Sequence, residues 1–235
     1  MGKTANDFVI NIATANGTGS QSSNLILMHS MFEMGVPVSG KNLFPSNISG
    51  LPTWYIIRAS DAGYQAPGDK TDIQVIMNKN TWMEDLEKVE SGTIIVYNED
   101  VKLPVERDDC ILLGMPMTKM ARGINPKLAR LMSNMYYVGA LAQLLEIEQS
   151  AIASAVSMQF KGKEKAIDLN MRAISEGRFY AEENWGFECP PIRQSTRQGP
   201  RHIPHRWQRS NGLGCYLRWH QYALMVPDNP LLLSR

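Results

Sequence analysis

Two periods of hydrophobic residues alternate along most of the chain. Short β-branched or apolar runs are typical of buried strands, whereas apolar residues spaced three and four apart are typical of amphipathic helices. The strand-like runs cover residues 8–14, 53–58, 72–77, 92–97 and 110–114. The helix-like runs cover residues 24–32, 82–89, 126–145, 147–160 and 163–183. This order predicts an α/β protein with a Rossmann-like open, largely parallel sheet and flanking helices.

A glycine loop joins the first predicted strand to the first predicted helix. It reads Asn16-Gly17-Thr18-Gly19-Ser20. Glycine allows a tight turn with positive φ, and the N–H groups of the following helix start suit an anion. The dinucleotide pattern G-x-G-x-x-G is met only in its first two glycines, because Ser22 occupies the third position. No acidic residue for a ribose follows about 20 residues later. The alternative is a turn that only packs helix on strand.

Residues 35–52 are interrupted by glycines and prolines, which rules out a regular helix there. We predict a long ordered loop, and such loops are usually functional. Its single cation, Lys41, stands beside amides and hydroxyls, including Asn42. The alternative is a crossover between strands whose apolar residues plug the end of the sheet. Those residues are Leu43, Phe44, Ile48 and Leu51.

The residues that most often carry chemistry are sparse. The three cysteines, Cys110, Cys189 and Cys215, contain no Cys-x-x-Cys, which predicts neither a disulfide framework nor a metal or iron–sulfur site in this chain. Cys110 is interpreted as a small core residue, and His29 as a partly buried helical histidine with a satisfied side chain. No Ser-His-Asp set or carboxylate pair emerges. We expect no secretory leader and no transmembrane helix, and the few scattered cysteines favour a reducing cytoplasm.

Charge is distributed unevenly. Residues 191–235 carry seven arginines, no lysine and one acid, Asp228, so this segment has a net charge of +6 within a chain of net charge +1. A basic tail normally suggests nucleic acid or a membrane surface. Interleaved Trp207, Tyr216 and Trp219 superficially resemble a base-stacking surface.

Four stretches resemble the γ-type domain of the 2-oxoacid:ferredoxin oxidoreductases. The resemblance covers about residues 7–189 and is closest to the N-terminal part of the 2-oxoglutarate-type α subunit. The stretches are the glycine loop, Ser39-Gly40-Lys41-Asn42-Leu43-Phe44-Pro45-Ser46-Asn47-Ile48, Gly50-Leu51-Pro52-Thr53-Trp54-Tyr55 and Asn170-Met171-Arg172-Ala173-Ile174.

This resemblance implies a part in the oxidative decarboxylation of a 2-oxoacid, with coenzyme A as acyl acceptor and ferredoxin as electron acceptor. Thiamine diphosphate, Mg²⁺ and the iron–sulfur cluster would be held elsewhere in the complete complex. This chain would hold no cofactor and would supply no catalytic residue. The implied direct partner is the β subunit. Binding to nucleic acid or to a membrane is not expected. The candidates for lining the coenzyme A approach are Gly17, Thr18, Gly19, Ser20, Lys41 and Asn42.

The resemblance stops after Cys189, so we divide the chain into residues 1–189 and residues 190–235. We expect the second part to be a frame-shifted, disordered C-terminal tail. Moving the frame forward by one base forces glycine at Trp207 and Trp219 and tryptophan at Met225, in the order that the family shows. This reading predicts a truncated fragment that is inactive alone. The alternatives are a genuine basic tail, a free-standing γ subunit acting as an assembly and binding module, and a nucleotide-dependent dehydrogenase, against which the missing third glycine argues.

Overall fold

The computed structural model describes residues 7–45, 48–60, 66, 70–102 and 107–185, all of which belong to one unit. The predictions for residues 190–235, and those for Cys189 and Cys215, lie outside the described residues. The division of the chain after residue 189 therefore stays a prediction.

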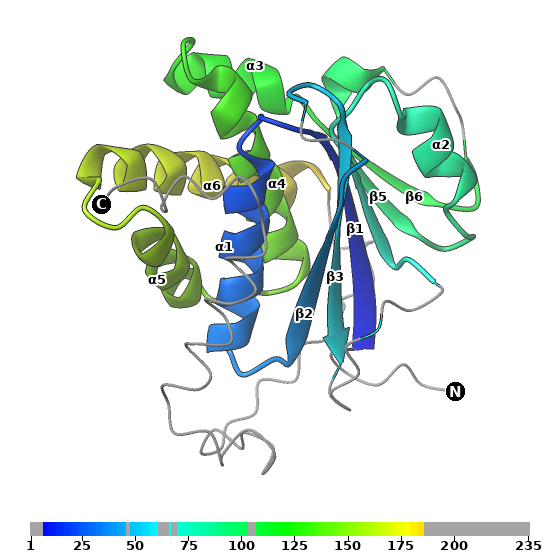
Figure 1. The fold of residues 1–235 in the computed structure, drawn as a ribbon, viewed down its shortest axis with the longest axis horizontal. Coiled ribbons are helices and arrows are strands. Elements are labelled where there is room, and N and C mark those ends of the chain that lie inside the picture. The colour runs from blue at the N-terminus through cyan, green and yellow to red at the C-terminus, as the bar shows by residue number, and fades with distance from the viewer. Residues whose placement is uncertain (1–6, 46–47, 61–65, 67–69, 103–106, 186–235) are drawn as a thin grey trace. The chain divides into compact units, whose positions relative to one another are not determined.

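A six-stranded sheet forms the centre of this unit, in the order β2-β3-β1-β4-β5-β6 (Figure 1). Strands β1, β4, β5 and β6 run parallel, and β3 pairs antiparallel with both β1 and β2. The predicted open, largely parallel sheet is therefore confirmed. The strands are β1 Asp7–Ala15, β2 Val38–Leu43, β3 Pro52–Ser60, β4 Ile73–Ile76, β5 Ile94–Asn98 and β6 Ile111–Met115.

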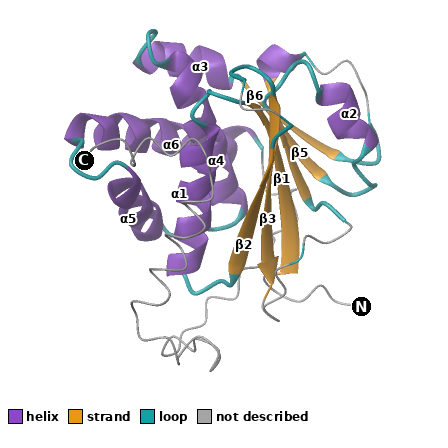
Figure 2. Ribbon diagram, viewed as in Figure 1, coloured by secondary structure: helices purple, strands orange, loops and turns teal. Residues whose placement is uncertain are grey.

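Helices cover the two faces of the sheet unequally (Figure 2). The helices α1, α4, α5 and α6 lie on one face, and the short α2 lies on the other. Neighbouring residues of β3 point to opposite faces of the sheet. Tyr55 contacts Met28 of α1, and Trp54 donates a hydrogen bond to Asp85 of α2. The helices are α1 Ser20–Glu33, α2 Trp82–Glu87, α3 Met117–Ile124, α4 Ala129–Leu144, α5 Gln149–Gln159 and α6 Glu164–Asn184, with a 3₁₀ turn η1 at Glu99–Val101.

The segment predicted as one long loop contains a strand, so that prediction is wrong for Val38–Leu43. Its glycine does not mark a turn. A Cβ at Gly40 would lie 2.3 Å from Met28 Sδ and 2.4 Å from the Tyr55 hydroxyl oxygen. Glycine therefore leaves the space that the Met28 and Tyr55 side chains occupy where α1 packs on the strand.

The chain after β6 also differs from the prediction. Helix α3 follows Pro116 directly and buries Met117 and Ala121, which lie four residues apart on one face. The next helix begins at Ala129 rather than Pro126, because the Asn125 side chain forms a turn first. Its Oδ1 accepts the N–H groups of Lys127 at 3.1 Å and Leu128 at 3.3 Å.

Two sequence predictions about single residues agree with the structure. His29 is half-buried, and this burial lowers the pKa of its imidazole while Glu33 acts to raise it. Cys110 directly precedes β6 and packs against the cluster between the sheet and α2, which includes Ile76, Leu86 and Ile95. Burial raises the pKa of its thiol, as expected of a packing residue rather than a nucleophile.

Candidate functional site

Two loops meet at the carboxyl ends of the parallel strands, where ligands of open α/β sheets usually bind. The glycine loop follows β1, and residues 44–51 connect β2 to β3. Asn16 holds them together through its backbone. Its N–H donates to the Leu51 carbonyl oxygen at 2.8 Å, and its own carbonyl oxygen accepts from Gly50 N–H at 2.8 Å. The two loops that carry the family resemblance therefore form one structure.

The glycine loop has the left-handed backbone that its sequence predicts. Gly17 has φ +76° and Gly19 has φ +80°. The space beside each glycine is occupied by another part of the chain. A Cβ at Gly17 would lie 2.6 Å from Ser49 Oγ, and one at Gly19 would lie 3.3 Å from Leu131 Cδ2 of α4. Both glycines therefore allow three segments to pack closely.

A side chain of α4 fixes the loop from the opposite side. Asn134 Nδ2 donates to the Thr18 carbonyl oxygen at 2.6 Å, and Thr18 Oγ1 donates to the Ala15 carbonyl oxygen at 2.7 Å. Asn134 is buried and Ser20 is 7% exposed. Asn134 was missed by the sequence analysis, although a polar residue on the apolar face of a predicted helix is a usable signal.

Asn42 belongs to this site. Its Nδ2 donates to Gln21 Oε1 in the first turn of α1 at 3.3 Å, and its Oδ1 accepts from Thr53 Oγ1 at 3.1 Å. The structure thus brings Asn42 to the helix start that follows the glycine loop.

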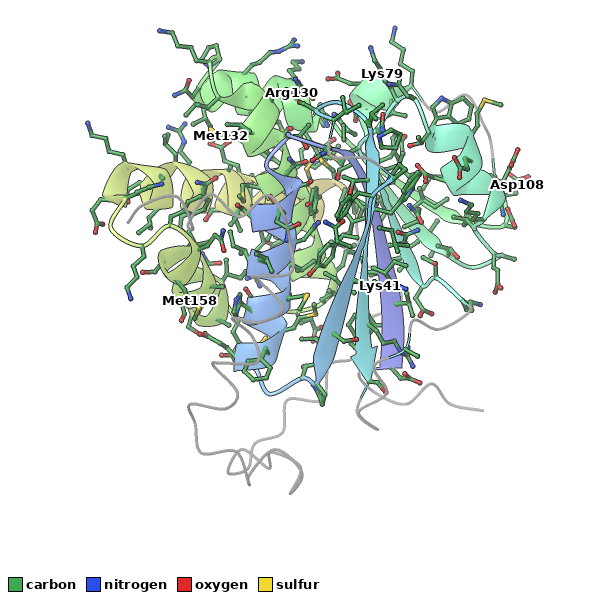
Figure 3. The ribbon with its side chains drawn as sticks, in the orientation of Figure 1. Lys41, Lys79, Asp108, Arg130, Met132 and Met158 are labelled. Atoms are coloured by element: carbon green, nitrogen blue, oxygen red, sulfur yellow. The ribbon has the colours of Figure 1, made fainter. Side chains whose placement is uncertain are left out.

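Lys41 lies on the opposite face of the sheet. Neighbouring residues of a strand point to opposite faces, and Lys41 pairs with Ile56, which faces α2. Its side chain is exposed, and Figure 3 places it part-way along β2. Lys41 and Asn42 therefore do not form one site.

The face that carries Lys41 has a recess of about 230 Å³. Asp85 Oδ1 accepts from Trp54 Nε1 at 2.6 Å, and Lys88 Nζ lies 5.7 Å from the centre of the Trp54 ring. Burial raises the pKa of the Asp85 carboxyl, although the Trp54 and Thr81 donors act to lower it. The recess is lined by Asn11, Leu43, Trp54, Ile56, Glu84 and Lys88.

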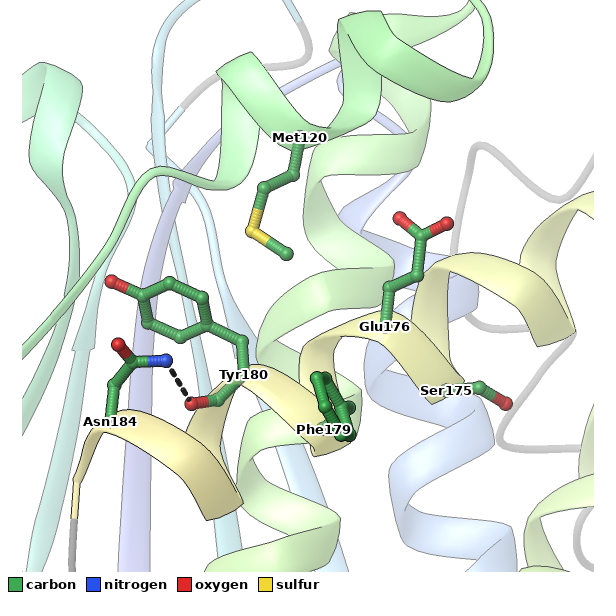
Figure 4. Close-up of a pocket in the computed structure, with 6 residues that line it drawn as sticks. All are labelled: Met120, Ser175, Glu176, Phe179, Tyr180 and Asn184. Carbon is green, nitrogen blue, oxygen red and sulfur yellow. Dashed lines mark hydrogen bonds between the residues drawn. The ribbon is translucent and has the colours of Figure 1, made fainter.

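A larger hollow of about 460 Å³ lies between α3 and α6 (Figure 4). Met120, Phe179 and Tyr180 give it a mainly apolar lining. Its carboxylate, Glu176, already accepts from the Tyr136 hydroxyl and from Arg172 Nε, each at 2.9 Å. The hollow therefore offers apolar surface, and we assign no chemistry to it.

Five exposed apolar side chains lie on the β2–β3 connection and at the start of α4, and we call them the apolar rim. Ile48 is 65% exposed and Leu131 is 46% exposed. The alternative in which Leu43, Phe44, Ile48 and Leu51 plug the end of the sheet does not agree with the structure, because all four side chains are exposed. The apolar rim consists of Phe44, Ile48, Leu51, Leu128 and Leu131.

Within the described part of the chain, no group of three His, Cys, Asp or Glu side chains is placed to hold a metal ion. We therefore derive no step through a metal ion or an iron–sulfur cluster. The part of the chain that the structure describes also has no helix long and apolar enough to cross a membrane.

The model of the family described as pyruvate ferredoxin/flavodoxin oxidoreductase matches residues 9–180. The chain belongs to this family. The match spans most of β1, the other five strands and most of α6, so the family assignment and the described fold concern the same residues.

Two curated proteins have related sequences. The α subunit of 2-oxoacid:ferredoxin oxidoreductase 2 from Aeropyrum pernix is 23% identical over 82% of this chain. The ketoisovalerate oxidoreductase subunit VorA from Methanothermobacter thermautotrophicus is 24% identical over 74% of this chain. The alignments cover 36% of each relative, so the chain spans about a third of their length.

Solved structures include both longer and similar-sized chains. The 2-oxoglutarate:ferredoxin oxidoreductase from Magnetococcus marinus, solved with 2-oxoglutarate, coenzyme A and succinyl-CoA bound, matches 82% of this chain and 33% of its own, with 25% identity and a TM-score of 0.71. The γ subunit of a keto/oxoacid ferredoxin oxidoreductase from Geobacter sulfurreducens matches 74% of this chain and 98% of its own, with 16% identity and a TM-score of 0.58. The second likeness concerns the fold alone.

Proposed function

We propose that this chain provides the γ-type domain of the α subunit of a 2-oxoglutarate:ferredoxin oxidoreductase. In the proposed reaction, 2-oxoglutarate loses CO₂, its acyl group passes to the coenzyme A thiol, and the released electron pair reduces ferredoxin. The observation that carries the proposal is the TM-score of 0.71 over 82% of the chain with the Magnetococcus enzyme, which was solved with this substrate and product.

The proposed role is structural and positional rather than catalytic. Thiamine diphosphate supplies the carbanion chemistry in such enzymes, and we propose that it, Mg²⁺ and the iron–sulfur cluster are held by other parts of a cytoplasmic complex. The polar groups around the glycine loop support this role. Asn16, Thr18, Asn42 and Asn134 are engaged in hydrogen bonds that fix the two loops. We therefore expect no decarboxylation by the chain alone.

We further propose that the glycine loop and Asn42 border the approach of coenzyme A. Gly17, Thr18, Gly19 and Ser20 share one end of the sheet with the Asn42–Gln21 bond. Lys41, the remaining sequence candidate, is a matched comparison because it neighbours Asn42 but faces the other side of the sheet. Only a substitution on the side that borders coenzyme A should change how the activity depends on the coenzyme A concentration.

Co-expression with the β subunit and the remaining α-subunit domains tests this function. We expect the complex to reduce ferredoxin with 2-oxoglutarate in preference to pyruvate or 2-oxoisovalerate, and the chain alone to be inactive. Asn42→Ala should raise the KM for coenzyme A several-fold, whereas Lys41→Ala should leave it unchanged. Preference for another 2-oxoacid would refute the substrate, and an unchanged KM in Asn42→Ala would refute the bordering role.

A second candidate is a free-standing γ subunit that acts as an assembly module near coenzyme A. One observation favours it: the chain matches 98% of the Geobacter γ subunit, and 95% of the pyruvate oxidoreductase subunit PORC from Thermotoga maritima, with 21% identity and a TM-score of 0.58. Assembly with a separately produced α subunit that lacks this domain would support it. Failure to assemble in that form, together with activity of the fused form, would exclude it.

A further inference from the structure

The corner between α3 and α4 is strongly cationic. Residues 110–145 contain four cations, Lys119, Arg122, Lys127 and Arg130, and neither aspartate nor glutamate. All four side chains are exposed. No ion pair between described residues involves any of them. The positive charge of this cationic corner is therefore directed to solvent or to a partner.

The cationic corner is held rigidly on the domain. Asn98 Nδ2, at the end of β5, donates to Thr118 Oγ1 of α3 at 2.8 Å. Asn125 connects the two helices through its side chain, which accepts two backbone N–H groups of the turn. On α4, Leu131 packs against Gly19 of the glycine loop. The four cations are therefore presented from fixed backbone, which reduces the ordering cost of docking.

Apolar side chains continue from the cationic corner into the apolar rim. Leu128 lies between Lys127 and Arg130, and Leu131 follows directly. Ile48 and Leu51 lie on the other side of the glycine loop. Figure 3 shows Arg130 at the end of the described unit where α3 and the start of α4 meet. An apolar area beside exposed charges is the usual composition of a protein–protein interface.

We propose that the apolar rim and the cationic corner together dock one acidic protein surface, on the β subunit of the oxidoreductase complex. This inference rests on the proposed function, because it specifies the partner's chemistry. The partner's face should be apolar opposite the apolar rim and should carry carboxylates opposite the cationic corner. A protein fits better than a free phosphate compound because small-ligand sites are concave. Here the cations stand exposed on a helix-to-helix turn among leucines.

The test measures association of the full chain with the purified β subunit at several salt concentrations. In the test variant, Lys119→Glu, Arg122→Glu, Lys127→Glu and Arg130→Glu are combined. The matched control combines Lys161→Glu, Lys163→Glu and Lys165→Glu, which are exposed cations around the start of α6. Charge reversal should lower the association rate by about tenfold or more at low salt, because surface charges mainly steer encounter. The control should change it less than about twofold.

The outcomes separate this inference from the proposed function. The inference is supported if the unaltered chain and the control bind more weakly as salt rises from 50 to 500 mM, and the test variant lacks this salt dependence. Equal binding by both variants overturns the inference and leaves the proposed assembly intact. No binding by the unaltered chain at any salt overturns both. Binding of coenzyme A or pyrophosphate that the test variant loses, with β-subunit binding unchanged, also overturns it in favour of a phosphate site.

Discussion

Asn134 of α4 and Thr18 of the glycine loop are joined by a hydrogen bond of 2.6 Å across 116 positions of the sequence. The bond runs from the Asn134 side-chain amide to a backbone carbonyl oxygen. It ties the turn after β1 to the helix that covers it. The conformation of the glycine loop therefore depends on α4 as well as on its own two glycines.

Replacing Asn134 with alanine should destabilise the protein. The substitution leaves the Thr18 carbonyl oxygen without this donor in a part-buried place, which costs about 1 kcal/mol or more of unfolding free energy. Denaturant unfolding of both proteins measures the difference. Asn184→Ala is the control, because its bond to the Tyr180 carbonyl oxygen lies on the exposed end of α6. A loss in Asn134→Ala no larger than in Asn184→Ala would contradict the role given to this bond.

The contact between α4 and α6 depends on two glycines. A Cβ at Gly139 would lie 2.0 Å from the Ile174 carbonyl oxygen, and one at Gly177 would lie 2.5 Å from the Tyr136 carbonyl oxygen. Because backbone rather than flexible side chain blocks each position, Gly139→Ala and Gly177→Ala should each lower the free energy of unfolding by about 1–3 kcal/mol or more.

Gly123→Ala should change the free energy of unfolding in the opposite direction to Gly139→Ala and Gly177→Ala. Gly123 is in α3 and has no atom within 4 Å of a built Cβ. Alanine there should raise the free energy of unfolding by about 0.5–1 kcal/mol, through its higher helix propensity. Equal effects at positions 123 and 139 in denaturant unfolding would show that helix packing does not limit residue 139.

The sequence was sufficient for the order of most elements, because their hydrophobic periods are strong. It failed for β2 because Gly40 resembles loop punctuation, although its lack of a side chain is required by Met28 and Tyr55. It failed for α3 because the helix has only eight residues, although Met117, Met120, Ala121 and Ile124 have helical spacing. At β2, contacts with distant residues override the local preference for a turn.

The candidate site was predicted only in part. The glycine loop was recognised from its own residues, since positive φ and a helix start are local properties. Grouping Lys41 with Asn42 required the segment to be a loop, and strand alternation separates the two. Asn134 was not predictable as a partner of Thr18, because 116 residues separate them and no local pattern indicates the contact.

Asp85 should make stability fall as pH rises. Burial raises the pKa of its carboxyl above 3.8, so the folded protein binds the proton more tightly than the unfolded chain. Its contribution is therefore most favourable below pH 3.8 and declines as pH rises from there through the folded pKa. Asp85→Asn keeps an acceptor for Trp54 and removes the charge. The stability of the wild type relative to Asp85→Asn should decrease over this range in denaturant unfolding.

Asp109 provides a control of the opposite sign. Hydrogen bonds from Arg107 lower the pKa of the Asp109 carboxyl below 3.8, so its contribution is present above that pH and is lost as pH falls through the folded pKa. The stability of the wild type relative to Asp109→Asn should therefore increase with pH. A difference between wild type and Asp85→Asn that also increases with pH would refute the assignment for Asp85.

Ile48 should be needed for assembly but not for folding. Its side chain is 65% exposed, so Ile48→Asp removes little buried surface and should change the free energy of unfolding by no more than about 0.5 kcal/mol. In the proposed docked complex, the aspartate would place an unpaired charge in the apolar centre of the interface. Met158→Asp is the matched control, because Met158 is 43% exposed and lies on α5, which contributes no residue to the apolar rim. Size-exclusion chromatography with the β subunit should show loss of the complex for Ile48→Asp only. Loss for both variants would mean that assembly responds to any exposed apolar residue, and the apolar rim would no longer be the docking surface.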